Sequence, residues 1–159
     1  RLDTLQAEYD AIALAMDALT QANNHLQNRF SPALGAETAR IFSALTAGRY
    51  DKVLLDRSLS LSAQPAGDAV PRALALLSQG AGDQLYLAAR LAICRMVLPQ
   101  DKAAPLILDD ALANFDDTRM AAALDWLVEE SRTRQILLFT CHRREGDYLR
   151  DRAHVISLN

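Results

Sequence analysis

The sequence predicts an α/β fold in which helices flank a parallel sheet, with a coiled-coil helix at the N-terminus. Short apolar strands alternate with helices in the second half of the chain, which is typical of a parallel sheet. A heptad pattern runs through the first thirty residues, and the low aromatic content of 6% favours helix. With 159 residues, 50% of them hydrophobic, the chain suits one modest domain with a buried core.

Charge and cysteine content exclude several classes of protein. The net charge of −3 excludes a strongly basic body that binds nucleic acid by charge alone. The two cysteines form no disulfide framework and fit a reducing compartment, so we expect a cytoplasmic protein. No apolar run approaches the roughly 20 residues of a membrane span, and we expect no membrane partner. The chain starts in mid-pattern without Met, so we expect a piece of something longer.

The N-terminal heptad predicts a coiled-coil arm over residues 1–31. Its seam positions are spaced alternately by three and four residues over four repeats: Leu2, Leu5, Tyr9, Ile12, Met16, Leu19, Asn23, Leu26 and Phe30. A buried Asn23 would set the register of the pair. The alternative is an ordinary amphipathic helix packed on a globular core, which needs a wider apolar stripe. The partner strand of the arm is expected outside this chain.

Pro32 and Gly35 are expected to interrupt this helix. A second helix is expected from about Ala36 to Ala47, with Gly48 as its stop.

A hairpin is expected next, followed by the alternating strands and helices. Its strands are 50–56 and 59–62, joined around Arg57-Ser58, and a loop covers 63–71. Later strands are expected at Leu106 to Asp109, Ile136 to Thr140 and His154 to Leu158.

A Ser/Gly-rich segment, 77–84, precedes an apolar helix expected from about Asp83 to Leu98. Ser78, Gly80 and Gly82 at a helix start make an anion cradle, because free N–H groups and the helix dipole point at a negative ligand. The alternative is a flexible turn before a core helix, which a short glycine motif does not exclude.

A buried strand ending in Asp109 and Asp110 places two carboxylates at the carboxyl edge of a sheet, where open α/β folds bind ligands. One carboxylate can hold Mg²⁺, and its neighbour can orient or deprotonate an attacking water. The alternatives are an Asp helix cap and a phospho-acceptor acid cluster.

Another apolar strand ends in Cys141 and His142, and a histidine there can contact a phosphate or an attacking water. The alternative is a surface histidine at the start of the next helix. A metal site using both residues is not expected, because adjacent strand residues point to opposite faces.

The order of these motifs resembles the ABC-class ATPases. Leu77-Ser78-Gln79-Gly80 is similar to their signature motif, and residues 106–110 to the Walker B strand with its catalytic acid. Residues 109–116 match the Walker B to D-loop stretch, and Cys141-His142 is similar to the switch-histidine strand end. The amino-acid sequences of residues 82–92 and 112–117 resemble those of the SMC/SbcC/RecF/RecN class, most of all bacterial YhaN-like AAA-family ATPases. The resemblance covers roughly residues 40–159.

The resemblance implies that residues 32–159 are the C-terminal lobe of a P-loop NTPase (ABC-type) head that hydrolyses ATP with Mg²⁺. Two heads would form an ATP-dependent homodimer of a DNA-repair or chromosome-maintenance machine, with DNA and a nuclease subunit as further partners. The implied roles are Asp109 for the metal, Asp110 for water, His142 for the transferred phosphate, Ser78, Gly80 and Gly82 for ATP held by the second head, and Asn114 and Asp116 for the D-loop interface.

Four departures from the class are visible. Gln79 replaces a glycine, Asp110 stands where most members have Glu, and Ala111 stands where many have Pro. No G-x-x-x-x-G-K-[ST] motif exists in the chain. We therefore expect the P-loop in a separate N-terminal half and no activity from this chain alone.

Two other functions remain open. The chain can be a non-catalytic coiled-coil assembly module, or a phosphotransfer domain that uses Asp109 and Asp110 as an acidic pair. The second alternative expects a later lysine, whereas both lysines of the chain precede the acids. Six arginines can form a basic patch or be scattered over the surface: Arg132, Arg134, Arg143, Arg144, Arg150 and Arg152.

Overall fold

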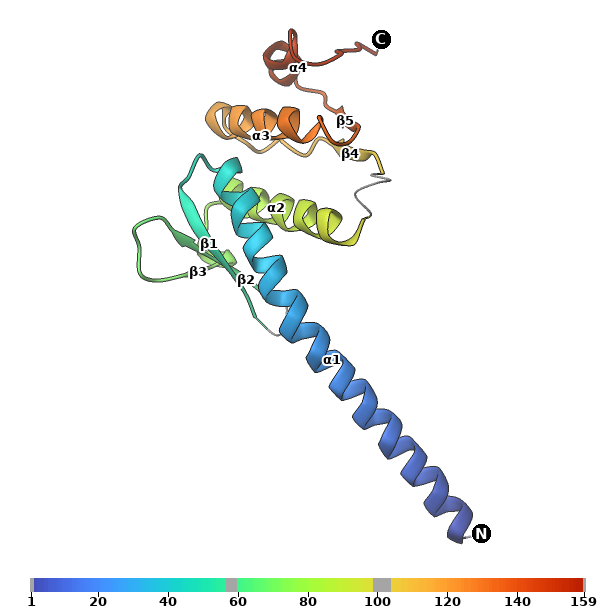
Figure 1. Ribbon diagram of the computed structural model, residues 1–159. Coiled ribbons are helices and arrows are strands. Elements are labelled where there is room, and N and C mark those ends of the chain that lie inside the picture. The colour runs from blue at the N-terminus through green and yellow to red at the C-terminus, as the bar shows by residue number, and fades with distance from the viewer. Residues whose placement is uncertain (1, 57–59, 99–103, 159) are drawn as a thin grey trace.

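The computed structural model describes residues 2–56, 60–98 and 104–158, with the side chains of 26 and 27 left undescribed. A long helix projects from a globular part that is built around two small sheets (Figure 1). In chain order the elements are α1 (Leu2–Leu45), β1 (Tyr50–Leu55), β2 (Leu61–Pro65), β3 (Arg72–Ala73), the 3₁₀ turn η1 (Leu74–Leu76), α2 (Gln79–Val97), β4 (Leu106–Asp109), α3 (Asp117–Glu130), β5 (Ile136–Phe139) and α4 (Arg143–Leu149).

Helix α1 is continuous through Pro32 and Gly35, so the expected interruption there is wrong. A proline inside a helix removes one backbone hydrogen bond and favours a kink. The segment after Pro32 is held by tertiary contacts, with Leu34, Ile41 and Phe42 buried in the core. Packing energy therefore outweighs the local helix-breaking preference.

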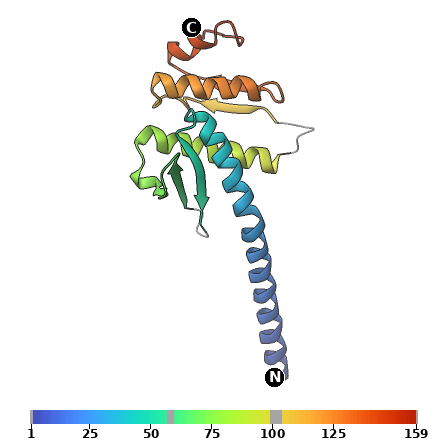
Figure 2. The ribbon, with the colours of Figure 1, turned by 60° about the vertical axis from the view of Figure 1, so that its left-hand side comes forward.

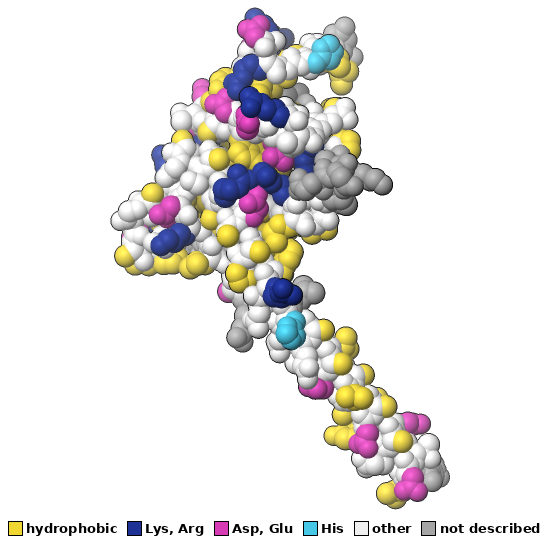
Figure 3. Space-filling view, in the orientation of Figure 1, with side chains coloured by type: hydrophobic (Ala, Val, Ile, Leu, Met, Phe, Trp, Pro, Cys, Tyr) yellow, Lys and Arg dark blue, Asp and Glu magenta, His cyan; other side chains and the backbone are white. Residues whose placement is uncertain are grey.

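The N-terminal half of α1 is a bare arm. Its apolar side chains are 60–84% exposed from Leu2 to Leu19, and Figure 3 shows hydrophobic side chains along the projecting helix. The exposed stripe is thus an unpaired surface of α1, as a seam without its partner would be.

No helix within the described residues is long and apolar enough to cross a membrane.

Helix α1 ends at Leu45, two residues before the expected end near Ala47, and Gly48 follows as the predicted stop. Ala47 and Gly48 both adopt positive φ, of 51° and 78°, and the Gly48 N–H donates to the Ser43 carbonyl at 2.8 Å. Glycine takes this conformation without strain, so it terminates the helix. The chain then turns back, and the ring of Tyr50 stacks on Phe42 with centroids 4.8 Å apart.

The predicted hairpin is present as the antiparallel pair β1 and β2, in which Val53 lies opposite Ala63. The predicted turn at Arg57-Ser58 lies outside the described residues. Strand β2 continues to Pro65, further than expected, and β3 adds a short third strand.

Strands β4 and β5 form the predicted parallel pair, with Leu108 opposite Leu138 and Asp109 opposite Phe139. The expected strand over 154–158 is wrong, because these residues are irregular and exposed. In both views β4 lies between α2 and α3 (Figure 1 and Figure 2).

The sheet is covered on one face only. Leu108 is 8% exposed, whereas Ile107 on the opposite face is 63% exposed. Leu137 and Phe139 of β5 are likewise exposed. Strands this apolar usually belong to sheets with both faces covered, so this face lacks a covering layer within the described residues.

An ion-pair network joins three helices. Arg95 of α2 lies 3.2 Å from Glu37 of α1 and 3.1 Å from Glu130 of α3. Arg40 also pairs with Glu37, and its hydrogen bond is the main reason why the pKa of Glu37 is lowered. These contacts fasten the arm-bearing helix to the part of the chain that carries the candidate site.

Candidate functional site

The signature segment forms the first turn of α2. The helix begins at Gln79, four residues before the expected start at Asp83, with Ser78 as its N-cap. The Ser78 hydroxyl accepts from the Ala81 N–H at 3.4 Å, which satisfies one free donor of the helix start. Gly80 and Ala81 are buried, and Gly82 is half-buried. Capping and packing of this turn outweigh the low helix propensity of the two glycines.

The segment 110–116 connects β4 to α3 and lies against the signature helix. The Asn114 amide donates to the Asp83 carboxylate of α2 at 3.1 Å. Asp116 caps α3 by accepting from the Arg119 N–H at 2.8 Å. The structure therefore brings the predicted D-loop residues next to the predicted signature, although the two lie over 30 residues apart in sequence.

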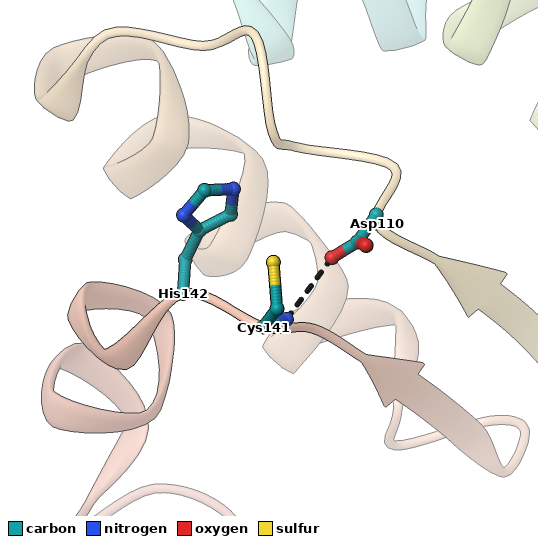
Figure 4. Close-up of side chains that lie close together, drawn as sticks. All are labelled: Asp110, Cys141 and His142. Carbon is teal, nitrogen blue, oxygen red and sulfur yellow. Dashed lines mark hydrogen bonds between the residues drawn. The ribbon is translucent and has the colours of Figure 1, made fainter.

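A second cluster lies where β4 and β5 end (Figure 4). The side chains of Asp110, Cys141 and His142 offer atoms that all lie within 4.8 Å of one another. Asp110 has a φ of 43°, and its N–H donates to the Phe139 carbonyl at 2.9 Å. Its Oδ1 atom accepts from the Cys141 N–H at 3.1 Å (Figure 4). The carboxylate is thus tied to the end of the neighbouring strand.

Cys141 and His142 do not point to opposite faces of a strand, as was expected from their adjacent positions. Strand β5 ends at Phe139, so these two residues lie beyond the strand and its alternation of faces. Their side chains lie together with Asp110, and His142 also precedes α4 as its N-cap residue. Thiol, imidazole and carboxylate can each bind a metal or exchange a proton, so these three side chains form a candidate reactive cluster.

Asp109 occupies the last position of β4 and its side chain is exposed. The opposite strand partner is Phe139, so Asp109 lies at the same carboxyl edge as Asp110 and His142. Two adjacent carboxylates therefore project at this edge with different surroundings, Asp110 hydrogen-bonded to Cys141 and Asp109 open to solvent.

Arg144 has a role at the site that the sequence did not predict, since the sequence offered it only as one of six arginines of a possible basic patch. Its Nη2 atom donates to the carbonyls of Leu112, Ala113 and Phe115 at 3.3, 3.4 and 2.8 Å. Its Nη1 atom contacts Asp117 at 3.0 Å. One guanidinium, with five donors in a rigid fork, thereby holds the whole segment between Asp110 and α3. The only available signal was an arginine two residues after His142.

The six arginines considered for a basic patch do not form one. Five of them pair with carboxylates: Arg132, Arg134, Arg144, Arg150 and Arg152. Arg134 is also buried, at 7% exposure. Figure 3 shows basic and acidic side chains interleaved over the visible face of the globular part. The described surface therefore offers no extended field of one sign from these residues.

Comparison of the fold identifies its class. The chain superposes on an SMC head domain from Pyrococcus furiosus, solved with an extended coiled coil and bound to the C-terminal domain of ScpA, with a TM-score of 0.63 at 20% identity; the match covers 92% of this chain and 37% of that one. A structure from work on ATP-driven dimerization and DNA-stimulated activation of SMC ATPases gives a TM-score of 0.66 at 21% identity, covering 86% and 89%. The fold is that of SMC-type heads, which are P-loop NTPases.

A sequence relative agrees with this class. Over 117 residues the chain is 32% identical to the uncharacterized protein YhaN of Bacillus subtilis strain 168, which covers 73% of this chain and 12% of the relative. No family model matches the chain. The resemblance to a C-terminal SMC-like head fragment, and to YhaN in particular, is confirmed. The chain spans about an eighth of the length of that relative.

Proposed function

We propose that this chain is the C-terminal lobe of an ATP-binding and hydrolysing head that dimerises around ATP. The observation that supports this most directly is the position of Asp110. Its carboxylate is held at the carboxyl edge of the β4–β5 sheet by the Cys141 N–H and lies within 4.8 Å of the His142 ring. Ligands of open α/β folds bind at this edge, and an acid beside a histidine can handle the proton of an attacking water.

The residues at this edge fit a magnesium ion. Asp109 is an exposed carboxylate at a strand end, and carboxylate oxygens are ligands that Mg²⁺ prefers. When bound with ATP, the metal would supply charge neutralisation of the phosphates. Asp110 would position the attacking water and receive its proton, and His142 would hydrogen-bond the transferred phosphate. Arg144 would keep Asp110 and Asn114 in register by holding the segment between them.

The missing half of the head has a place to pack. The open face of the sheet, with Ile107, Leu137 and Phe139, is apolar and uncovered among the described residues. A lobe that carries the P-loop would cover this face and supply the backbone donors that cradle the phosphates. In this proposal residues 1–31 are the end of a coiled-coil arm and residues 32–159 are the head lobe.

The signature turn at the start of α2 and the cluster around Asp110 would serve different ATP molecules. Ser78, Gly80 and Gly82 would contact ATP held by a second head, and Asn114 and Asp116 would lie at the interface between heads. We place such a dimer in a cytoplasmic DNA-repair or chromosome-maintenance machine, with DNA and a nuclease subunit as further partners. Support for this setting comes from the SMC structures, one of which concerns ATP-driven dimerization and DNA-stimulated activation.

The test is to assemble the head from this chain and a P-loop lobe, and to measure nucleotide binding and sedimentation with and without Mg-ATP. Binding of Mg-ATP accompanied by a shift from one head to two is the expected result. A head that binds ATP tightly and stays monomeric at all concentrations would contradict the sandwich. A head that binds no nucleotide would contradict the proposal as a whole.

A further inference from the structure

The side chain of Arg119, on the first turn of α3, lies against the signature turn. Its Nη2 atom donates to the Ser78 hydroxyl at 3.4 Å, and its Nε atom lies 3.4 Å from the Asp116 carboxylate. The side chain is only 19% exposed. We propose that Arg119 is a phosphate-binding and positioning residue, which links Asp116 to Ser78 in one head and contacts the terminal phosphate of the ATP held by the other head.

Gly80 gives this proposal a steric basis. A Cβ atom built on Gly80 would collide with Nη1 of Arg119, whereas its contact with the Asn114 carbonyl would be an ordinary 3.5 Å. Gly80 lies within helix α2, and no positive φ is found there, so backbone conformation does not require glycine. The absence of a side chain at position 80 therefore makes room for the guanidinium of Arg119.

The chemistry of the guanidinium suits a terminal phosphate. Arginine presents a rigid fork of N–H donors that can bind two phosphate oxygens at once, and it stays charged at every physiological pH. Here the fork is placed beside a serine hydroxyl and the start of a long helix, where N–H groups and the helix dipole also favour an anion. A contact of 3.4 Å to Ser78 is long for a hydrogen bond, so a phosphate oxygen can replace it readily.

Arg119 also has room to move. It lines a pocket of about 300 Å³ together with Arg49, Asp116 and Gln84. Gln84 is fully buried, and its Oε1 atom has no hydrogen-bond partner in the described structure. The guanidinium can therefore turn from Ser78 towards this pocket without displacing core side chains. A change of position of Arg119 would carry the state of the signature turn to Asp116, because both residues lie on the same short segment.

The proposal rests on the proposed function, and it is tested in the complete head with Arg119→Gln, Arg119→Lys, Gly80→Ala and the double variant Gly80→Ala/Arg119→Gln. We expect Arg119→Gln to leave Mg-ATP binding to the monomeric head unchanged and to weaken ATP-dependent dimerisation by roughly 10-fold or more, as the loss of a charged hydrogen bond does. Arg119→Lys keeps the charge but loses the fork of donors. Its ATP-dependent dimerisation should therefore be weaker than that of the unaltered head and stronger than that of Arg119→Gln. Arg132→Gln, an exposed arginine paired with Glu129, is the matched control and should dimerise normally.

The double variant separates the proposal from its rivals. Because the methyl group in Gly80→Ala would push Arg119 away, Gly80→Ala should weaken dimerisation about as much as Arg119→Gln, and the two changes together should do little more. If the two single changes weaken dimerisation additively, or if Arg119→Gln dimerises normally, the role proposed for Arg119 is wrong, while the proposed function of the head is unaffected. If the unaltered head itself does not dimerise with Mg-ATP, the proposed function is wrong. The behaviour of the unaltered head therefore distinguishes failure of the proposed function from failure of the role of Arg119.

Discussion

The Cys141 N–H donates to the Asp110 carboxylate at 3.1 Å and so joins the ends of the two parallel strands. The bond fixes one oxygen of Asp110 as an acceptor and leaves the other free. Asp110 adopts a φ of 43°, a region in which Asp and Asn are enriched among non-glycine residues. The carboxylate therefore has a defined direction before any ligand binds.

Asp110→Asn should abolish ATP turnover without disturbing the fold. Asparagine keeps the acceptor for Cys141 and tolerates the positive φ, but it cannot act as a base. We expect turnover by the complete head to fall by about 10²–10⁴-fold, with ATP binding nearly intact and head dimers longer-lived. Asp109→Asn should instead weaken Mg-dependent binding, because a direct or water-bridged metal contact is lost. Normal turnover by Asp110→Asn, or equal loss of binding by both variants, would show that the roles are assigned wrongly.

The chain by itself should not hydrolyse ATP. It has no P-loop motif, so most donors that cradle the phosphates are missing. Calorimetry with Mg-ATP should show very weak binding or none, and a phosphate-release assay should stay at background. Micromolar affinity of the chain alone would mean that this lobe already forms a complete site.

The arm should associate through its exposed seam. Leu5, Ile12 and Leu19 are at least 60% exposed on α1 and project from one seam at heptad spacing. Sedimentation should therefore show concentration-dependent self-association of the chain. Replacing these three residues by Glu should remove it, while Ala7→Glu, Ala11→Glu and Ala18→Glu, made together on the side of the helix away from the seam, should not. A strict monomer at high concentration would contradict the coiled-coil interpretation.

Stability should fall in acid through Glu37. The hydrogen bond from Arg40 and the charge of Arg95 hold the pKa of Glu37 below its ordinary value. A carboxyl whose pKa is lower in the folded state stabilises the fold above its unfolded pKa, near 4.5, and loses that contribution as the pH falls through the folded pKa. Glu37→Gln should lower the urea midpoint at pH 7 and flatten its fall between about pH 5 and 3. Glu129→Gln, which breaks an exposed pair with Arg132, should change both far less; equal effects of the two variants would exclude the role of Glu37.

Alkylation of Cys141 should block turnover. Its thiol is exposed and lies within 4.8 Å of the side-chain atoms of Asp110 and His142, so a maleimide adduct would fill the space between them. In a complete head carrying Cys94→Ala, treatment with N-ethylmaleimide should abolish ATP hydrolysis. Cys141→Ser keeps the backbone N–H that holds Asp110, and it should remain active and resist the reagent. Persistent activity after full labelling of Cys141 would show that this space is not used.

Local sequence determined most elements of the fold. The apolar runs at 106–109 and 136–139 predicted strands, and the segment ending in Gly48 predicted a helix stop, because these features depend on neighbouring residues alone. The SMC-like class was indicated by the resemblance that residues 77–92, 106–117 and 141–142 carry.

Tertiary structure decided what those local rules could not. Helix α1 continues through Pro32 because residues after it are packed on α2 and β1, and residues 154–158 remain irregular although their pattern is that of a strand. The roles of Arg119 and Arg144 also depend on folding, because their partners Ser78 and Leu112 lie 41 and 32 residues away in sequence. Long side chains can reach any group that the fold brings within a few ångströms, so no spacing in the sequence predicts such contacts.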